Sequence, residues 1–524
     1  MTLRRLLLAI SLTLSTLCLA VVAQDTRPSN APPPATLQVQ ARLVVLDVAV
    51  TDANGLPADG LTAADFRVLE DGQPQTIISV EPPQAHIRPS PPASASNPES
   101  FSPENPAAFG QAPSTVLLLD QLNTQFEDSS FARRALAEYL AKQPAQLTQP
   151  TALLSLQEHG LRQLSGFTLN RDALQQALAK QPTAYPWTLS VKGKADHGPI
   201  DRLDLSLRAL ESMAQSYLRI PGRKNLIWVG GGFPSLDPAT LDSQDADEVK
   251  AAFRHITNLM LEARLTLYAI DPGSTAPGMT EIVDADQMAF VMAAGDSLTT
   301  GTVDPFDSEE DFDRLGPLTG GRIIRARNDI AAQIADAATA GSHYYTVAYR
   351  PTSDSEAHAA FRKIKVQVLR SGLKASTRVG YYARPEDAAW TRSNLAYDLS
   401  AAAESPLTWN GLRLAAIHEP GAPPGSLKID LKVRAGDLSW RPLPDGTSEA
   451  HIAVESLQLD GSGNILHRNI ETLTANAAKD VNLADPERTA DFALVLAPER
   501  RTRNFRFVVR DSTSGRISTV VVAR

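Results

Sequence analysis

The stretch that decides the fold is Ser114-Thr-Val-Leu-Leu-Leu-Asp-Gln-Leu-Asn-Thr124. An apolar run of this length, bounded by polar residues, is typical of a fully covered strand in a parallel sheet. Ligands of open α/β sheets bind just beyond the carboxyl ends of such strands. The sequence therefore predicts that Asp120, followed by Asn123 and Thr124, lies at the edge of a sheet where a ligand is expected.

From Ser114 to residue 341, strand and helix patterns alternate. Further strands are predicted at 152–157, 161–166, 225–229, 265–270 and 322–325, and helices at 128–142, 171–180, 202–218, 246–263 and 329–340. Such alternation predicts a doubly wound, Rossmann-like α/β domain at 114–341, with helices on both faces of the sheet.

The segments outside this domain are rich in strand and turn signals. In chain order we expect a tether at 24–36, a β unit at 37–82, a Pro- and Ser-rich linker at 83–113, a β meander at 342–385 and a β-sandwich at 386–524. The meander is expected to join the early β unit in one sheet. The α/β domain would then be an insertion between the two.

The first 23 residues resemble a secretory signal, with Arg4 and Arg5 ahead of an apolar stretch and small residues before Gln24. We expect a periplasmic or secreted protein, with a retained N-terminal anchor as the alternative. The only cysteine, Cys18, lies inside this segment, so disulfides and Cys-bound zinc are not expected in the mature protein. No later run of about 18 apolar residues exists, so no membrane span is expected after signal removal.

The length and net charge of the chain restrict the number of domains and the kinds of partner that are expected. A chain of 524 residues is too long for one core, so several domains are expected. The net charge of -9, with no run of Lys and Arg, argues against nucleic acid as a partner. We expect Arg223 and Lys224, just before a predicted strand, to be solvated at a turn. The acidic stretch at 304–313 is expected to be a solvated surface loop, with a calcium loop as the alternative.

Four segments carry a family resemblance. They are Val-Thr-Asp-x-x-Gly-x-Pro and the following Asp-Phe-x-Val-x-Glu-Asp-Gly within 48–72, Leu-Leu-Leu-Asp-x-x-Asn-Thr at 117–124, Pro-Gly-Arg-Lys-Asn-Leu-Ile-Trp at 221–228 with Gly-Phe-Pro at 232–234, and the run from Thr-Gly-Gly at 319–321 to Val-Gly-Tyr-Tyr-Ala at 379–383. Together they resemble the von Willebrand factor type A (VWA)-related domain family of acidobacterial secreted proteins. The resemblance implies a VWA fold in an exported protein, more often a binding or assembly module than an enzyme.

The resemblance also raises the question of a metal site. VWA domains that bind a cation carry Asp-x-Ser-x-Ser in the first loop, whereas this chain has Asp120-x-Leu122-x-Thr124. Leu122 cannot ligate, and Gly230-Gly-Gly232 stands where metal-binding relatives carry Asp. We therefore expect a degenerate metal-ion-dependent adhesion site (MIDAS), in which Mg²⁺ or Mn²⁺ would have only Asp120 and Thr124 as ligands.

Evidence for catalysis is sparse. The nine histidines form no His-Glu-x-x-His motif, and no Gly-x-Ser-x-Gly follows a strand. His197 and Asp271 are the only candidates near the ligand edge, and Asp271 has capping of the turn at Pro272 as its alternative role. The glycines at 230–232 fit close packing better than a phosphate cradle. No catalytic residue is predicted.

The sequence thus predicts a non-enzymatic protein that binds another protein through the carboxyl-edge loops of its sheet. We call these residues the binding rim; they are Asp120, Asn123, Thr124, Gly230, Gly231, Gly232 and Asp271. A divalent-metal-dependent adhesin that uses Asp120 and Thr124 and an unrecognised envelope hydrolase remain as alternatives.

Overall fold

The computed structural model describes residues 43–89, 99–181, 198–234, 243–273, 282–283, 314–325, 329–351, 361–382, 392–420 and 423–524. The predicted signal segment, the tether, His197 and the acidic stretch at 304–313 lie outside these residues. Within the described ranges, no helix combines the length and the apolar composition needed to cross a bilayer.

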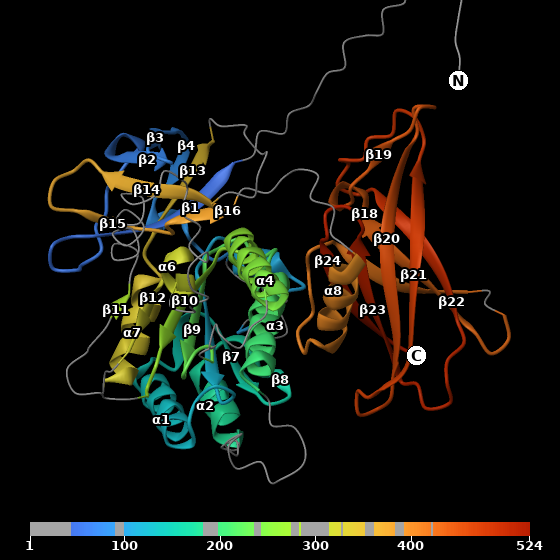
Figure 1. Ribbon diagram of the computed structural model, residues 1–524, viewed down its shortest axis with the longest axis horizontal. Helices are drawn as coiled ribbons and strands as arrows, with labels where there is room; N and C mark the ends of the chain where they lie inside the picture. The colour runs from blue at the N-terminus through green and yellow to red at the C-terminus, as the bar shows by residue number, and fades with distance from the viewer. Residues whose placement is uncertain are drawn as a thin grey trace, which may run out of the picture. The chain divides into compact units, whose positions relative to one another are not determined.

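An eight-stranded sheet forms the centre of the α/β domain, in the order β11-β12-β10-β9-β6-β7-β8-β5 (Figure 1). Its strands are β5 (Ser100–Phe101), β6 (Ser114–Asp120), β7 (Gln146–Gln157), β8 (Gly160–Asn170), β9 (Lys224–Val229), β10 (Leu265–Ile270), β11 (Ile282–Val283) and β12 (Arg322–Ile324). β6 runs parallel to both of its neighbours, β7 and β9, whereas β8 is antiparallel to β7. The chain places β7 on one side of β6 and later β9 on the other side. The switch point of the sheet therefore lies between the carboxyl ends of β6 and β9.

Helices cover both faces of this sheet, which confirms the doubly wound α/β prediction (Figure 1). One face packs against α1 (Phe126–Lys142), α2 (Arg171–Lys180) and α7 (Ile330–Ala340), and the other against α3 (Pro199–Tyr217), α4 (Ser243–Glu262) and α6 (Leu315–Leu318). Side chains of β6 alternate between the two cores: Leu117 and Leu119 enter one, and Val116 and Leu118 the other. A strand buried on both faces reads as a continuous apolar run for this reason.

The linker prediction for 83–113 is wrong over its second half. The segment contains the 3-10 turns η2 (Pro83–Ala85) and η3 (Pro106–Phe109), and its strand β5 pairs with β8 at the sheet edge. Phe109 is fully buried, with its ring centroid 5.3 Å from that of Phe101 and 5.2 Å from that of Phe167. Isolated aromatic residues show no period, so no local pattern indicated that this segment completes the core.

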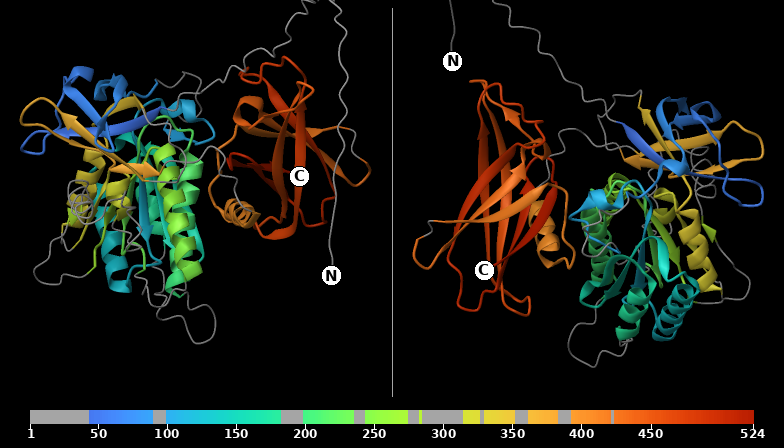
Figure 2. Two further views of the ribbon diagram at one scale, coloured as in Figure 1. Left: turned by 45° about the horizontal axis from the view of Figure 1, so that its top comes forward. Right: turned by 180° about the vertical axis from the view of Figure 1, so that it is seen from behind.

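The early and late β segments pair with each other, but they form two sheets rather than the predicted single sheet (Figure 2). One sheet has the order β15-β1-β13-β4 and the other β16-β14-β2-β3. The strands are β1 (Val44–Thr51), β2 (Phe66–Glu70), β3 (Gln73–Pro74), β4 (Thr76–Glu81), β13 (Tyr345–Arg350), β14 (Phe361–Val368), β15 (Lys374–Ser376) and β16 (Gly380–Tyr382), with the turn η1 (Ala63–Asp65) before β2. Val48 and Val347 from the first sheet and Val68 and Val366 from the second share one core. β1 of the first sheet and β2 of the second alternate in burial, so each of the two strands turns one apolar face to this core.

Arg223 and Lys224 are buried, so the prediction that they are solvated at a turn is wrong. Only 2% of Arg223 and none of Lys224 is exposed. The two sheets formed by the early and late β segments, which we call the β unit from here on, cover this end of β9. There the backbone N–H of Arg223 donates to the hydroxyl of Tyr344 at 3.1 Å. The burial arises from a segment more than a hundred residues away, which local sequence patterns do not report.

The last part of the chain contains two further sheets, β17-β18-β22 and a five-stranded sheet in which β21 pairs with β20 beside the path β19-β20-β23-β24. The strands are β17 (Leu414–Glu419), β18 (Leu427–Arg434), β19 (Arg441–Pro442), β20 (Ser448–Leu459), β21 (Ile465–Ala477), β22 (Thr489–Leu496), β23 (Asn504–Asp511) and β24 (Ile517–Ala523), with the turn η7 (Ala435–Asp437) after β18. Leu431 and Phe492 of one sheet share a core with Val454 and Phe507 of the other.

A helix, α8 (Arg392–Glu404), precedes these strands and was not predicted (Figure 1). Its residues Leu399 and Ala402 pack with Trp409 and with Val508 of β23. The helix is rich in alanine and serine and lacks a clear apolar stripe, so its period does not stand out in the sequence.

Candidate functional site

The structure brings together two loops of the binding rim. The first rim loop runs from Asp120 to Thr124, and the third rim loop contains Gly230 to Gly232 after β9. β6 and β9 are neighbours in register, with Leu119 opposite Val229, so Asp120 and Gly230 follow at the same sheet edge. A Cβ atom on Gly230 would lie 2.5 Å from the Cβ of Asp120 and 2.5 Å from the Oγ1 of Thr124. Gly230 has a φ of +152°, a conformation that residues with a side chain rarely adopt. The two loops are therefore packed too closely for any side chain at position 230.

The Asp120 carboxylate, which is fully buried, accepts four N–H groups. Its Oδ1 accepts the backbone N–H groups of Leu122 and Asn123, both at 2.9 Å. Its Oδ2 accepts the indole Nε1–H of Trp228 at 3.0 Å and the amide of Asn123 at 3.3 Å. Burial raises the pKa of Asp120 to about 6, and the four donors oppose this rise. The carboxylate thus holds the loop that follows it against β9.

The other rim residues of the first and third loops are bonded within the protein as well. The Oγ1 of Thr124 accepts the backbone N–H of Gly231 at 2.9 Å, and Thr124 is 4% exposed. Asn123 also donates to the Oγ of Ser206 at 3.0 Å, which ties the loop to α3. Leu122 packs into the core below the loop.

These residues do not fit a divalent cation. Mg²⁺ and Mn²⁺ need oxygen atoms whose lone pairs face the ion, whereas both Asp120 oxygens face N–H donors. The Oδ1 of Asn123 is buried and has no hydrogen-bond partner among the described residues, but it is a single neutral oxygen. Across the described part of the chain, no three His, Cys, Asp or Glu residues are placed to hold a metal ion.

Asp271 lies at the same edge, because Gly230 donates its N–H to the carbonyl of Ile270 at 3.0 Å. Its Oδ1 accepts the backbone N–H of Gly273 at 2.8 Å, which matches the turn-capping alternative. Asp128 lies beside it: a Cβ on Gly273 would be 3.0 Å from the Oδ1 of Asp271 and 3.2 Å from the Oδ2 of Asp128. Burial raises the pKa of both carboxyls, and the Asp128 charge adds to the rise at Asp271.

A second buried network, not foreseen from the sequence, fixes the first loop from the other side. The Oε1 of Gln121 accepts from Ser155 at 3.1 Å, from Gln157 at 3.2 Å and from Gln181 at 3.1 Å. These donors come from the end of β7 and the residue after α2. The first rim loop is therefore held by four neighbouring elements: β9, α3, β7 and the end of α2.

Two exposed apolar residues, each in the first turn of a helix, were also missed. Phe126, the first residue of α1, is 47% exposed, and Ile200, in the first turn of α3, is 48% exposed. Glu127 and Asp128 follow Phe126 directly. The signal in the sequence was an aromatic residue placed between the rim loop and an acidic first helical turn, where a core position is not expected.

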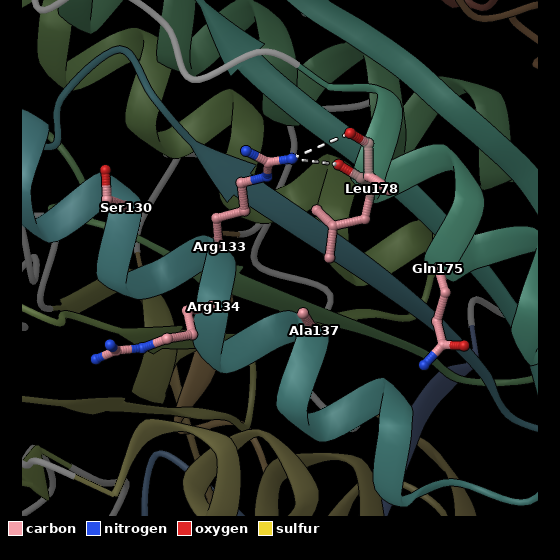
Figure 3. Close-up of a pocket in the computed structure, with 7 residues that line it drawn as sticks. Ser130, Arg133, Arg134, Ala137, Gln175 and Leu178 are labelled. Carbon is pink, nitrogen blue, oxygen red and sulfur yellow. Dashed lines mark hydrogen bonds between the residues drawn. The ribbon is translucent and has the colours of Figure 1, made fainter.

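A surface pocket of about 390 Å³ lies between α1 and α2 (Figure 3). There the Nη2 of Arg133 donates to the carbonyl oxygens of Leu178 at 3.3 Å and Ala179 at 3.1 Å, which caps the end of α2. In Figure 3 the side chains of Arg134 and Gln175 point away from Arg133. Because its polar groups do not converge, this pocket carries no ligand site.

The buried Asp120 carboxyl makes stability depend on pH in a defined direction. Its folded pKa of about 6 exceeds the usual value of 3.8, so its contribution is fully present below pH 3.8 and is lost as pH rises through 6. We expect the stability of the wild type relative to Asp120→Asn to fall by about 2 kcal/mol between pH 4 and 7. Urea unfolding at a series of pH values measures this difference, with Asp52→Asn in an exposed turn as the matched control. A difference that stays constant with pH would contradict the assignment.

No known protein family matches the chain, and no curated protein matches it. Two solved structures show a partial likeness. Proximal thread matrix protein 1 from the mussel byssus is 9% identical, over 30% of this chain and 38% of that one, with a TM-score of 0.21. The SpRpn10 VWA domain is 15% identical, over 31% of this chain and 90% of that one, with a TM-score of 0.17. Likeness at these scores carries no argument, and the fold rests on the strand order and the two helical layers.

Proposed function

We propose that this is an exported, non-enzymatic protein that binds another protein at the cell envelope through the loops at the carboxyl edge of its α/β sheet, without a metal ion. One observation carries the proposal: the side chain of Phe126 is exposed close to a rim in which Asp120 and Thr124 are bonded within the protein. Exposed aromatic residues on a rigid frame are common anchors of protein interfaces.

The charge around Phe126 indicates what kind of partner surface would fit it. Glu127, Asp128 and Asp271 surround the start of α1 with carboxylates. Arg325 lies 3.8 Å from Asp271 and offsets part of this charge. A partner that offers an apolar cavity for Phe126, flanked by Lys or Arg, complements such a surface.

The β segments on either side of the α/β domain have a supporting role in this proposal. In the proposal the β unit and the C-terminal strands, arranged as a β-sandwich, act as spacers and further contact surfaces. The resemblance to the acidobacterial VWA-related family favours a binding or assembly role over catalysis. Neither alternative gains support from the described residues: Asp120 offers no free carboxylate oxygen to a cation, and Asp271 caps a turn.

The proposal is tested by using the wild type and Phe126→Ser as bait for envelope proteins in buffer that contains EDTA. Because Phe126 is half exposed, the variant should fold with nearly unchanged stability, yet it should bind an envelope partner at least about tenfold more weakly than the wild type. Ile78→Ser, a similarly exposed apolar residue on β4, is the matched control and should retain the partner. Retention of the same partner by Phe126→Ser, or capture that requires Mg²⁺, would overturn the proposal.

A further inference from the structure

A buried cluster of cations lies where the β unit meets the α/β domain. We call it the basic junction; its members are Arg223, Lys224, Arg264 and Arg378. Arg223, Lys224 and Arg378 are 2%, 0% and 6% exposed, and the side chain of Arg264 is 17% exposed. Arg378 precedes β16, whereas Arg223 and Arg264 precede strands of the central sheet and Lys224 is the first residue of β9.

One buried carboxylate, Asp47 of β1, faces this cluster. Asp47 is bonded to Arg264 through Nη2 and, at 3.3 Å, through Nε. Burial opposes its ionisation, but Arg264, Arg223 and Arg378 together hold the pKa of Asp47 below its usual value. The other acid that acts on Arg264 is Glu81, whose side chain is 49% exposed. The buried positive charge of the junction therefore exceeds its buried negative charge.

Several donors in the junction also lack acceptors. The Nζ of Lys224 donates to the carbonyl of Ile220 at 2.6 Å, and no carboxylate bonds it among the described residues. The Nη1 of Arg378 and the Nδ2 of Asn225 are buried without a hydrogen-bond partner there. Asn225 belongs to the junction because its Oδ1 accepts the Nε–H of Arg223 at 3.1 Å. Leaving such groups unbonded destabilises the folded state, and more so when they are charged.

We propose that the basic junction binds one small inorganic anion, such as chloride, which accepts the free N–H group of Arg378 and balances the excess positive charge. A water molecule could accept the same hydrogen bond, but it carries no charge to set against the cations. The near-complete burial of the donors favours a monatomic anion over phosphate. Burial lowers the pKa of Lys224 well below its usual value and that of Arg378 to about 10, so burial opposes the charged form of both side chains.

Anion binding here would join the β unit to the α/β domain, because Arg378 belongs to the first and Arg223 to the second. A ligand that binds only the folded state raises the melting temperature in a saturable way. We expect the full chain after signal removal to melt about 2–4 °C higher in sodium chloride than in sodium gluconate at equal ionic strength. The difference should grow with chloride concentration and then level off.

The variant Arg378→Met should lose this chloride dependence, and Arg370→Met, an exposed arginine of the same β unit, should keep it. Crystals grown in bromide should show an anomalous peak within hydrogen-bonding distance of Arg378 Nη1, which decides the matter even if Arg378→Met does not fold. Equal melting temperatures of the wild type in chloride and gluconate, or no bromide at this position, would overturn the proposal.

Discussion

Replacement of Asp47 by alanine is expected to lower the free energy of unfolding by about 3–5 kcal/mol, because it removes the buried carboxylate that faces the basic junction. The loss of one partner of a buried ion pair leaves the remaining charges desolvated and uncompensated. Here the remaining charges are Arg264 and its neighbours Arg223 and Arg378. The β unit should then separate from the end of β9 before the α/β domain unfolds.

Urea unfolding of the two proteins measures the change. Glu138→Ala is the matched control, because Glu138 pairs with Lys142 and the two side chains are 55% and 67% exposed. Exposed ion pairs contribute little to stability, so this control should remain close to the wild type. Equal losses for Asp47→Ala and Glu138→Ala would show that the junction does not depend on the Asp47 charge.

The second large effect is expected at the rim: Gly230→Ala should destabilise the protein by about 3 kcal/mol or more. The new methyl group would lie 2.5 Å from the Cβ of Asp120 and from Thr124 Oγ1, so the two loops must separate. The φ of +152° adds strain for any residue with a side chain. Separation of the two loops would also break the hydrogen bond from the Gly231 N–H to the Oγ1 of Thr124.

Gly55→Ala separates strain from crowding. Gly55 has a φ of +79°, but a Cβ there would meet nothing within 4 Å. We expect this control to lose about 1 kcal/mol, as backbone strain alone predicts. Similar unfolding midpoints for the two glycine variants would contradict the close approach of the first and third rim loops.

The α/β domain could be predicted from the sequence because its signals are local. A strand buried on both faces, such as β6, is an uninterrupted apolar run, and its helices carry a clear period. β5 and α8 escaped prediction because neither has such a signal. β5 is two residues long, and α8 is recognised only by its packing against Trp409 and β23.

The position of the rim could be predicted, but not how its polar groups are satisfied. Asp120 and Trp228 are 108 residues apart, and only the parallel pairing of β6 with β9 brings them into contact. The burial of Lys224 likewise depends on a β unit built from both ends of the inserted domain. Long-range pairing of this kind leaves no periodic pattern in a single sequence.

The central claim is that the Asp120 oxygens are committed to N–H donors of the protein, so that the rim works without a cation. A titration of the wild type with Mg²⁺ and Mn²⁺, followed by its melting temperature, tests this most directly, because a bound ion stabilises the folded state in proportion to RT ln(1 + [L]/Kd). The structure predicts no shift up to millimolar metal. A saturable rise that Asp120→Ala or Thr124→Ala abolishes would contradict it.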